Sequence, residues 1–298
     1  MTEYAYNPSF HKPGQLKRKI MTSEKHQKKI AVINDLSGYG RCSLTVALPI
    51  ISALKVQCCP VPTSILSSHT GFPTYFFDDY TEKMPLYIEQ WKKLDLEFDG
   101  IYSGFLGSEE QITIVIDMIK EFKMPSTKVI IDPIMGDHGK PYQTYTPRMC
   151  SRMKELVCFG DIVTPNLTEA CILTGREYRS AFKRSELSQM AEEIRAMGPK
   201  EVVITGVREG SYVVNVTAEA DGTVRFFRTL RVGCERPGTG DVFSSIIAAQ
   251  TVKGIPLREA AKKAAGFVKS CIVKSDELNV PVKNGVCFEE LLSQLIGR

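Results

Sequence analysis

A glycine-rich loop followed by an aspartate is the segment of this sequence with the clearest chemical content. Residues 236–245 are Arg-Pro-Gly-Thr-Gly-Asp-Val-Phe-Ser-Ser, and they lead directly into the small, apolar residues 246–249. Glycines let consecutive backbone N–H groups turn toward one point, and a helix N-terminus adds the positive end of its dipole. The loop therefore predicts an anion hole suited to a phosphoryl group in transit.

Asp241 lies in the first turn of the predicted helix, beside this hole. Aspartate is also a favoured N-terminal cap, so a purely structural role is the competing interpretation. A cap alone does not require glycines on both sides of Thr239, which favours a chemical role. A carboxylate here can accept a proton from an attacking hydroxyl while the amides of Gly238, Thr239 and Gly240 stabilise the charge that leaves on ATP.

A second glycine loop, Gly38-Tyr39-Gly40-Arg41-Cys42-Ser43, superficially resembles a dinucleotide-binding fingerprint. Two features argue against it. Ser43 stands at the third glycine position, and Cys58 and Cys59 stand where a ribose-binding acid is expected. An oxidoreductase is therefore a weak alternative, and a Walker-type phosphate loop is excluded because the sequence has no Gly-Lys-Ser/Thr.

The elements that must position these loops alternate along the chain. Short apolar runs predict strands at residues 30–33, 56–61, 100–102, 128–131, 161–163 and 201–205. Periodic patterns and caps predict helices at residues 43–54, 108–121, 146–156, 166–173, 185–197, 241–253, 257–274 and 288–295. Residues 34–40 are expected to form a polar loop, and residues 211–216 and 223–232 an antiparallel pair. This order predicts an α/β fold: a mostly parallel central sheet with helices on both faces and an antiparallel edge pair.

Composition and charge exclude several classes of protein. The formal net charge of the 298 residues is +4, but residues 1–29 alone hold seven basic and two acidic side chains. We expect residues 1–28 to be a disordered extension and residues 29–298 to form one near-neutral domain, without a broad nucleic-acid-binding face. No apolar run is long enough to span a membrane and no secretory h-region is present, so a cytoplasmic location is expected. The nine cysteines lie mostly in apolar stretches and are expected to be reduced, buried thiols without a structural zinc site.

Four segments taken together resemble the pyridoxal kinase branch of the ribokinase superfamily. They are Ser68-His69-Thr70-Gly71-Phe72, Asp132-Pro133-Ile134-Met135-Gly136-Asp137, Thr164-Pro165-Asn166-Leu167-Thr168-Glu169-Ala170 and Gly238-Thr239-Gly240-Asp241. They follow the family's order and spacing, and the resemblance covers residues 29 to about 295. It implies ATP-dependent phosphorylation of the 5′-hydroxymethyl group of pyridoxal, pyridoxine or pyridoxamine, with Mg²⁺, a monovalent cation such as K⁺ as a further candidate, and a homodimer.

The resemblance also implies roles for individual residues. Asp241 matches the general base, and Gly238, Thr239 and Gly240 match the anion hole. The positions that match cation ligands are Asp132, Asp137, Thr164 and Glu169, and those that match ATP contacts are Asp132, Thr164, Asn166, Glu169 and Thr205. Thr70 and Phe105 match substrate contacts. Purely structural roles stay open as alternatives for four residues: a strand-end turn at Asp132, a helix cap at Asn166, a core residue at Phe105 and a structural hydrogen bond at His69.

Asp35 departs from the family pattern, because familiar pyridoxal kinases carry a serine near the ring nitrogen at this place. We expect Asp35 to pair with a protonated pyridinium, a charge-assisted contact. The departure leaves the preferred vitamer open, and it leaves hydroxymethylpyrimidine kinase of thiamine synthesis as the alternative enzyme. A non-catalytic pyridoxal-phosphate-binding protein is disfavoured, because a binder needs no base at Asp241. Thiol chemistry at Cys42, near the substrate loop, is left undetermined.

Overall fold

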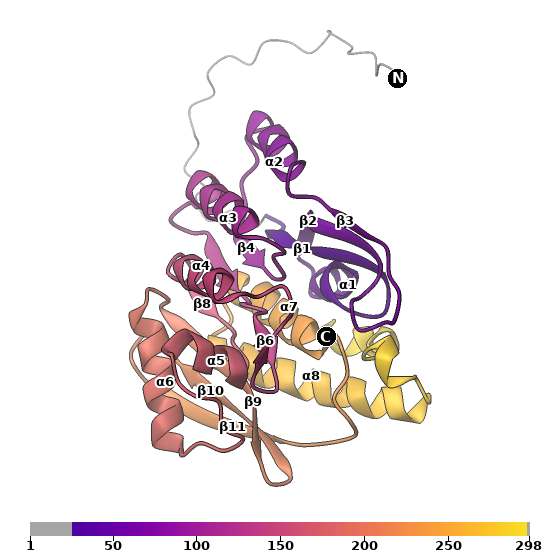
Figure 1. Ribbon diagram of the computed structural model, residues 1–298, viewed down its shortest axis with the longest axis vertical. Coiled ribbons are helices and arrows are strands. Elements are labelled where there is room, and N and C mark those ends of the chain that lie inside the picture. The colour runs from indigo at the N-terminus through magenta and orange to yellow at the C-terminus, as the bar shows by residue number, and fades with distance from the viewer. Residues whose placement is uncertain (1–25, 297–298) are drawn as a thin grey trace.

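A nine-stranded sheet is the framework of the protein (Figure 1). The structure is a computed structural model that describes residues 26–296, so most of the expected N-terminal extension lies outside the described residues. The strands of this sheet, in spatial order, are β11 (Val224–Leu230), β10 (Tyr212–Ala218), β9 (Glu201–Glu209), β8 (Ile162–Val163), β5 (Lys128–Ile131), β4 (Gly100–Ser103), β1 (Lys29–Tyr39), β2 (Gln57–Ser68) and β3 (Phe77–Asp79). A separate hairpin joins β6 (Gly136–Asp137) to β7 (Lys140–Pro141).

The sheet is parallel in its centre and antiparallel at its edges. The strands from β2 through β1, β4, β5 and β8 to β9 pair in parallel. At one edge β10 pairs antiparallel with both β9 and β11, and at the other edge β3 pairs antiparallel with β2. The predicted fold class, including the antiparallel edge pair, is confirmed.

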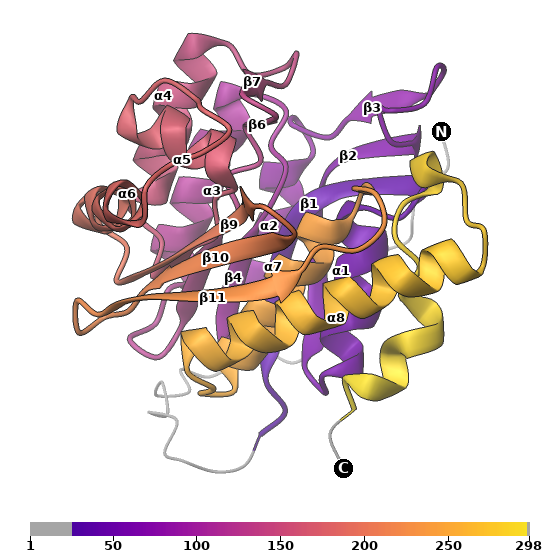
Figure 2. The same ribbon diagram turned by 90° about the horizontal axis from the view of Figure 1, so that it is seen from below.

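Helices cover both faces of the sheet, as Figure 2 shows. One face carries α1 (Ser43–Ala53), α7 (Thr239–Val252) and α8 (Leu257–Glu277), and the other carries α2 (Met84–Lys93), α3 (Glu109–Phe122), α4 (Pro147–Val157), α5 (Leu167–Thr174) and α6 (Arg184–Ala196). Two short 3₁₀ helices, η1 (Val282–Asn284) and η2 (Glu289–Gln294), follow α8. Strand side chains alternate between two buried clusters: Ile30 and Val32 pack toward α1 and α7, whereas Ala31 and Ile33 pack toward the opposite layer. This burial on both faces explains why the central strands are almost wholly apolar.

The first strand corrects one expectation. Residues 34–39 do not form a loop but continue β1, with Leu36 opposite Ile65 and Tyr39 opposite Ser68 on β2. The pairing register shifts between Asn34 and Leu36, where Thr63 and Ser64 of β2 stand opposite Asp35 alone, so β2 carries a β-bulge beside Asp35. Backbone pairing with β2 outweighs the polar, glycine-containing sequence. Bulges recur next to active sites because they re-aim a side chain.

Several elements escaped the sequence analysis for identifiable reasons. β2 continues through Pro60 and Pro62 to Ser68, which is tolerated because β3 lies beside only its last part. In α2 only Met84 is fully buried, but Tyr87, Ile88 and Trp91 follow it at helical spacing and pack against the core. This apolar pattern was present in the sequence and was overlooked. The expected burial of the thiols holds for Cys171 and Cys271 but not for Cys158, which is exposed.

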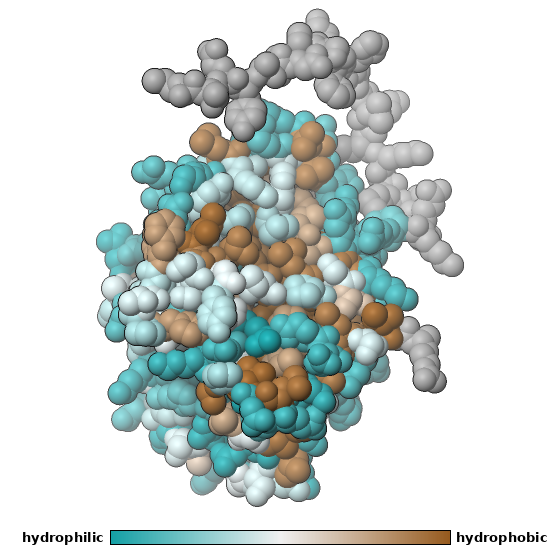
Figure 3. All heavy atoms as spheres, turned by 90° about the vertical axis from the view of Figure 1, so that its right-hand side faces the viewer, coloured by the Kyte–Doolittle hydropathy of each residue, from teal (hydrophilic) through white to brown (hydrophobic). Residues whose placement is uncertain are grey.

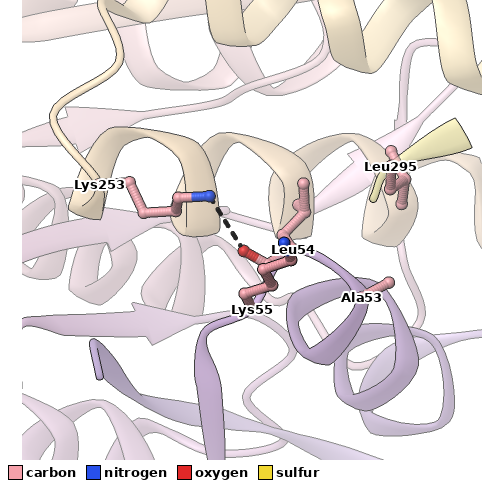
Figure 4. A pocket seen from close by; sticks show the side chains of 5 residues that line it. All are labelled: Ala53, Leu54, Lys55, Lys253 and Leu295. Atoms are coloured by element: carbon pink, nitrogen blue, oxygen red, sulfur yellow. Dashed lines mark hydrogen bonds between the residues drawn. The ribbon is translucent and has the colours of Figure 1, made fainter. Parts of the chain in front are cut away.

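A small pocket lies at the other ends of α1 and α7, away from the glycine loop. It encloses about 110 Å³ between Ala53, Leu54, Lys55, Lys253 and Leu295, as Figure 4 shows. The Nζ of Lys253 donates to the carbonyl of Leu54 at 3.2 Å. The lysine thus satisfies a carbonyl at the C-terminal end of a helix, where positive charge is favoured.

No helix in residues 26–296 has the length and apolar character that crossing a membrane requires.

Candidate active site

The carboxyl ends of the parallel strands place several predicted residues in one row. The amide of Asp132 donates to the carbonyl of Ser103 at 2.8 Å, and the amide of Thr164 donates to that of Ile131 at 3.0 Å. Thr205 continues the row through a 2.9 Å bond from its amide to Pro165. Open α/β sheets bind their ligands at this edge. The structure therefore brings these predicted residues to one side of the sheet.

The N-terminus of α7 meets this row and forms the glycine loop. Gly238 has φ +81°, and a Cβ there would lie 2.0 Å from the carbonyl oxygen of Arg41, so only glycine fits. Gly240 differs, because a Cβ there would have no heavy atom within 4 Å. The first intrahelical bond runs from the amide of Val242 to Gly238, so the amides before Val242 have no intrahelical partner. These free amides and the open space at Gly240 are suited to the predicted anion hole.

Asp241 sits between this hole and the end of β1. Burial, together with the nearby charge of Asp35, raises the pKa of its carboxyl to about 6 against the opposing effect of the Ser43 amide and the Asn34 side chain. Its Oδ1 is buried and has no hydrogen-bond partner within the described part of the chain. A carboxylate with a pKa near neutrality and a free oxygen is suited to accept a proton.

Asp35 is a second buried carboxylate on this side of the sheet. Its Oδ2 accepts a hydrogen bond from the Ser37 hydroxyl at 2.8 Å. Burial raises its pKa, whereas hydrogen bonds from the side chains of Ser43 and Ser37 act to lower it. Asp35 forms no ion pair with any residue of the described chain. Such a group gains from a cationic or proton-donating ligand.

Cys42 lies between these carboxylates. Burial, followed by the charges of Asp241 and Asp35, raises the pKa of its thiol to about 12. The thiol is therefore protonated at neutral pH and is a poor nucleophile.

A second group of polar side chains surrounds Asp132. Burial raises the pKa of this carboxyl well above its usual range, and the charges of Glu169 and Asp241 add to the effect, while the hydroxyls of Ser244 and Thr164 oppose it. Those two hydroxyls are hydrogen bonded to each other at 3.1 Å. Ser244 lies on α7 one turn after Asp241, so this group joins the strand row to the glycine loop.

Asn166 and Glu169 form a capping box at the start of α5. The Asn166 Oδ1 accepts from the Glu169 amide at 2.9 Å, and the Glu169 Oε2 accepts from the Asn166 amide at 2.8 Å. The other Glu169 oxygen accepts from the Met135 amide at 2.9 Å, and the Asn166 Nδ2 donates to the Gly136 carbonyl at 2.8 Å. Burial raises the pKa of Glu169 to about 7. Both residues thus hold the β6–β7 hairpin in place, in keeping with the capping alternative for Asn166.

Asp137 lies in that hairpin and is exposed. Its Oδ1 accepts from the His138 amide at 2.7 Å, and its Oδ2 lies 3.5 Å from the His138 Nε2. Its charge helps to raise the pKa of Glu169. The structure therefore places Asp137 at the rim, apart from the buried group around Asp132.

The predicted substrate contacts lie on two segments that contact the second half of β1. Thr70 is exposed in the turn that follows β2, and Phe105 is half-buried after β4, with its amide donating to the Asn34 Oδ1 at 2.9 Å. His69 acts structurally: its Nε2 lies 2.8 Å from the Lys283 carbonyl, and its Nδ1 accepts from the Gly71 amide at 3.1 Å.

Figure 3 looks onto the side of the molecule that carries β3 and shows apolar side chains gathered across it. The chain between β2 and β3 contributes the exposed Tyr75 and Phe76. The loop that carries Thr70 is thus continuous with an aromatic surface.

The sequence analysis missed two contributors to this site. Asn34 orients its surroundings through bonds to the amides of Asp35 and Phe105, and Gly104 leaves room for its side chain. Ser43 presents its amide to Asp241 from a strained backbone with φ +53°. A polar residue directly after an apolar strand was a usable signal for Asn34, whereas nothing local marks the conformation of Ser43.

The oxygen atoms of Asp132 and Thr164, beside the glycine loop, are suited to a hard divalent cation. No group of three or more His, Cys, Asp or Glu side chains is arranged to hold a metal ion in residues 26–296. Mg²⁺ usually takes one or two carboxylates and completes its shell with water and substrate phosphate. Asp132, a buried acid whose negative charge is disfavoured, together with the Thr164 hydroxyl, meets that description.

The fold and the site define a kinase of the ribokinase-like class. The family model for phosphomethylpyrimidine kinase matches residues 48–286, and the chain belongs to this family. A Bacteroides thetaiotaomicron protein, provisionally named a phosphomethylpyrimidine kinase, is 36% identical, with a TM-score of 0.90 over 93% of this chain and 96% of that chain. The same protein was also crystallised with pyridoxal.

Of two further similar proteins, one is named a pyridoxal kinase and the other a hydroxymethylpyrimidine/phosphomethylpyrimidine kinase. Pyridoxal kinase from Lactobacillus plantarum is 26% identical, with a TM-score of 0.84 over 90% of this chain and 96% of that chain. The hydroxymethylpyrimidine/phosphomethylpyrimidine kinase of Rhizobium meliloti is 26% identical over 81% of this chain and 89% of its own length. Membership of the family implies ATP use and a divalent metal ion.

Proposed function

We propose that this kinase transfers the γ-phosphoryl group of ATP to the 5′-hydroxymethyl group of vitamin B6 (pyridoxal, pyridoxine or pyridoxamine). The products are the 5′-phosphate and ADP. The hydroxyl oxygen bonds to the γ-phosphorus as the bond to the β-phosphate oxygen breaks, and the hydroxyl proton passes to Asp241.

The buried pair of carboxylates on the acceptor side carries this proposal. Asp35 has no ion-pair partner among residues 26–296, and a protonated pyridine nitrogen offers it a charge-assisted hydrogen bond. A phosphomethylpyrimidine would instead bring a phosphate toward Asp35 and Asp241, and like charges in a buried site repel strongly. The site therefore favours a neutral or cationic acceptor. The crystallisation of the Bacteroides protein with pyridoxal supports the same acceptor class.

Each group has one task in this proposal. The amides of Gly238, Thr239 and Gly240 hold the phosphoryl oxygens, and Asp241 orients the hydroxyl and removes its proton. On the acceptor side, we propose that Thr70 and Phe105 contact the ring. For ATP we propose contacts to Asn166 and Thr205, which face each other through a bridge between their backbones.

Asp132 and Thr164 would hold Mg²⁺ together with phosphate oxygens. The ion would neutralise charge on the transferring phosphoryl group. Glu169 and Asp137 are the further cation positions of the proposal. The contacts of Glu169 with two backbone amides favour an indirect role for it, and the exposure of Asp137 makes it the weaker candidate. A monovalent cation such as K⁺ belongs to the same proposal and is tested by exchanging K⁺ for Na⁺.

Hydroxymethylpyrimidine kinase is the second candidate. Its support is the family match and the name of the Rhizobium relative. Its acceptor is a neutral alcohol with a ring amine, so Asp35 does not exclude it. A non-catalytic pyridoxal-phosphate-binding protein is disfavoured by the free, proton-accepting oxygen of Asp241.

ATP consumption with each B6 vitamer and with hydroxymethylpyrimidine tests the proposal in one panel. We expect turnover with at least one vitamer and formation of its 5′-phosphate. Turnover with hydroxymethylpyrimidine alone would replace the proposal by the second candidate. The role of Asp35 is tested by Asp35→Ser, which should raise the vitamer KM and change its pH profile. An unchanged KM and profile would refute the pairing with the pyridinium.

A further inference from the structure

Arg236 is a buried arginine directly before the anion-hole loop. Its side chain is 3% exposed. Its Nη1 donates to the Val280 carbonyl and its Nη2 to the Asp276 Oδ1, both at 2.8 Å. Gly233, with φ +52°, leaves room for Asp276, because a Cβ there would lie 2.2 Å from the Asp276 Oδ2. The segment before the anion-hole loop, residues 233–236, therefore packs against the C-terminal end of α8 and the residues that follow it.

The chain after α8 then returns to the acceptor side of the site, as Figure 2 shows beside β1 and β2. The Lys283 carbonyl contacts the His69 Nε2 at 2.8 Å, and the Asn284 carbonyl accepts from the Arg41 amide at 3.3 Å. The Val286 amide donates back to the Pro237 carbonyl at 3.1 Å. Residues 276–286 therefore contact the anion-hole loop, the loop before α1 and the loop that carries Thr70.

We propose that residues 276–286 act as a strap that fixes the anion-hole loop relative to the acceptor loop, with Arg236 as the positioning residue that anchors it. The inference rests on the proposed function, which assigns one loop to the phosphoryl group and the other to its acceptor. In-line transfer depends on the separation of these groups, and a small misplacement costs a large factor in rate.

Arg236 acts through the strap rather than on phosphate. Both of its terminal nitrogens are engaged by Asp276 and Val280, and its buried charge is compensated there. A lysine carries the same charge but lacks the planar fork that reaches two acceptors. Arg236→Lys therefore keeps the charge and loses the geometry.

His69 carries the effect to the acceptor loop. Its Nδ1 accepts from the Gly71 amide, so the hydrogen-bond network assigns the ring proton to Nε2, which donates to the Lys283 carbonyl. The ring also packs against Phe72, with centroids 4.6 Å apart. Loosening the strap at Arg236 should therefore release Gly71 and Phe72, which directly follow Thr70 in the chain.

Hydrogen exchange and steady-state kinetics of Arg236→Lys and Asp276→Asn test the strap. Arg176→Lys is the matched control, because Arg176 also spans one backbone carbonyl and one carboxylate, those of Glu186 and Glu193. We expect the amides of Gly71 and Phe72 to exchange at least about fivefold faster in both strap variants and unchanged in the control. We also expect kcat to fall roughly tenfold to a hundredfold, with KM for ATP within about threefold of the wild type.

Three outcomes would overturn the strap. The first is unchanged exchange of Gly71 and Phe72. The second is a raised KM for ATP at unchanged kcat, which would make Arg236 a phosphate ligand. The third is a full kcat in a variant that is merely less stable. Exchange needs no turnover, so it decides the strap even if the wild type phosphorylates no B6 vitamer, a result that would refute only the proposed function.

Discussion

The buried carboxylates of Asp35 and Asp241 lie close enough for the charge of one to raise the pKa of the other. Asp35 comes from β1, opposite a bulge in β2, and Asp241 from the first turn of α7, so elements separated by about 200 residues bring the two carboxylates together. The pair links the choice of substrate to the strength of the base, because any ligand that neutralises the charge of Asp35 also lowers the pKa of Asp241.

Asp241→Asn removes the proposed base. We expect kcat to fall about 10²- to 10⁴-fold, the usual worth of general base catalysis, while ADP binding measured by calorimetry is retained. The variant should also be more stable above pH 6. The pKa of Asp241 is 3.8 in the unfolded chain and about 6 in the folded one, so the wild type loses roughly 3 kcal/mol of stability as pH rises from about 4 to about 6. Near-normal turnover would eliminate Asp241 as the base.

Gly240→Ala tests the open space of the anion hole. The backbone of Gly240 accepts a side chain and its Cβ would contact nothing, so the fold should persist with an unchanged or slightly raised melting temperature. The added methyl group would occupy the place of a phosphoryl oxygen, and kcat should fall roughly 10²-fold. Gly266→Ala in α8 is the control, since its Cβ also meets nothing within 4 Å. Equal activity of the two variants would contradict the assignment.

Asp35→Asn tests the electrostatic link between the two carboxylates. The charge of Asp35 raises the pKa of Asp241, so its removal should lower that pKa. Because the base must be unprotonated, activity rises with pH through the pKa of Asp241. The acid limb of kcat/KM should therefore lie near pH 6 in the wild type and move to lower pH in the variant. Because Asp35 is also the proposed partner of the ring nitrogen, the pKa of Asp241 is in addition measured by NMR in both ligand-free proteins; an unmoved pKa would break the link.

Asp132→Asn and Asp137→Asn separate the two proposed cation positions. Asp132 is buried in a site that disfavours its charge, whereas Asp137 is exposed at the rim. We expect the Mg²⁺ concentration for half-maximal activity to rise at least about tenfold in the Asp132 variant and less than about twofold in the Asp137 variant. A larger effect at Asp137 would reverse the assignment.

Much of the fold, and the part of the site around Asp132, Thr164 and Asn166, could be predicted from local sequence patterns. Asp132 and Thr164 each follow a short apolar strand, and parallel strands bring their carboxyl ends to one edge. The N-cap at Asn166 and the left-handed cap at Gly175 bound α5 close to where the sequence places it. In these cases the information lies within a few residues.

The acceptor side depends on contacts between distant parts of the chain. The continuation of β1 past Asn34 is decided by its pairing with β2, not by its own composition. The contact of His69 with Lys283 spans 214 residues, and that of Arg41 with Asn284 spans 243. No local pattern encodes such contacts, so the sequence analysis made no prediction for residues 275–287, between the helices expected at 257–274 and 288–295.

A competition experiment tests the central claim most directly. Pyridoxal, hydroxymethylpyrimidine and phosphomethylpyrimidine are mixed at equal concentration with ATP and Mg²⁺, and the products are followed by mass spectrometry. The acidic acceptor site predicts that pyridoxal 5′-phosphate forms with a kcat/KM at least about tenfold above that of either pyrimidine, and that no diphosphate forms. Faster phosphorylation of a pyrimidine, above all of the phosphorylated one, would contradict the account.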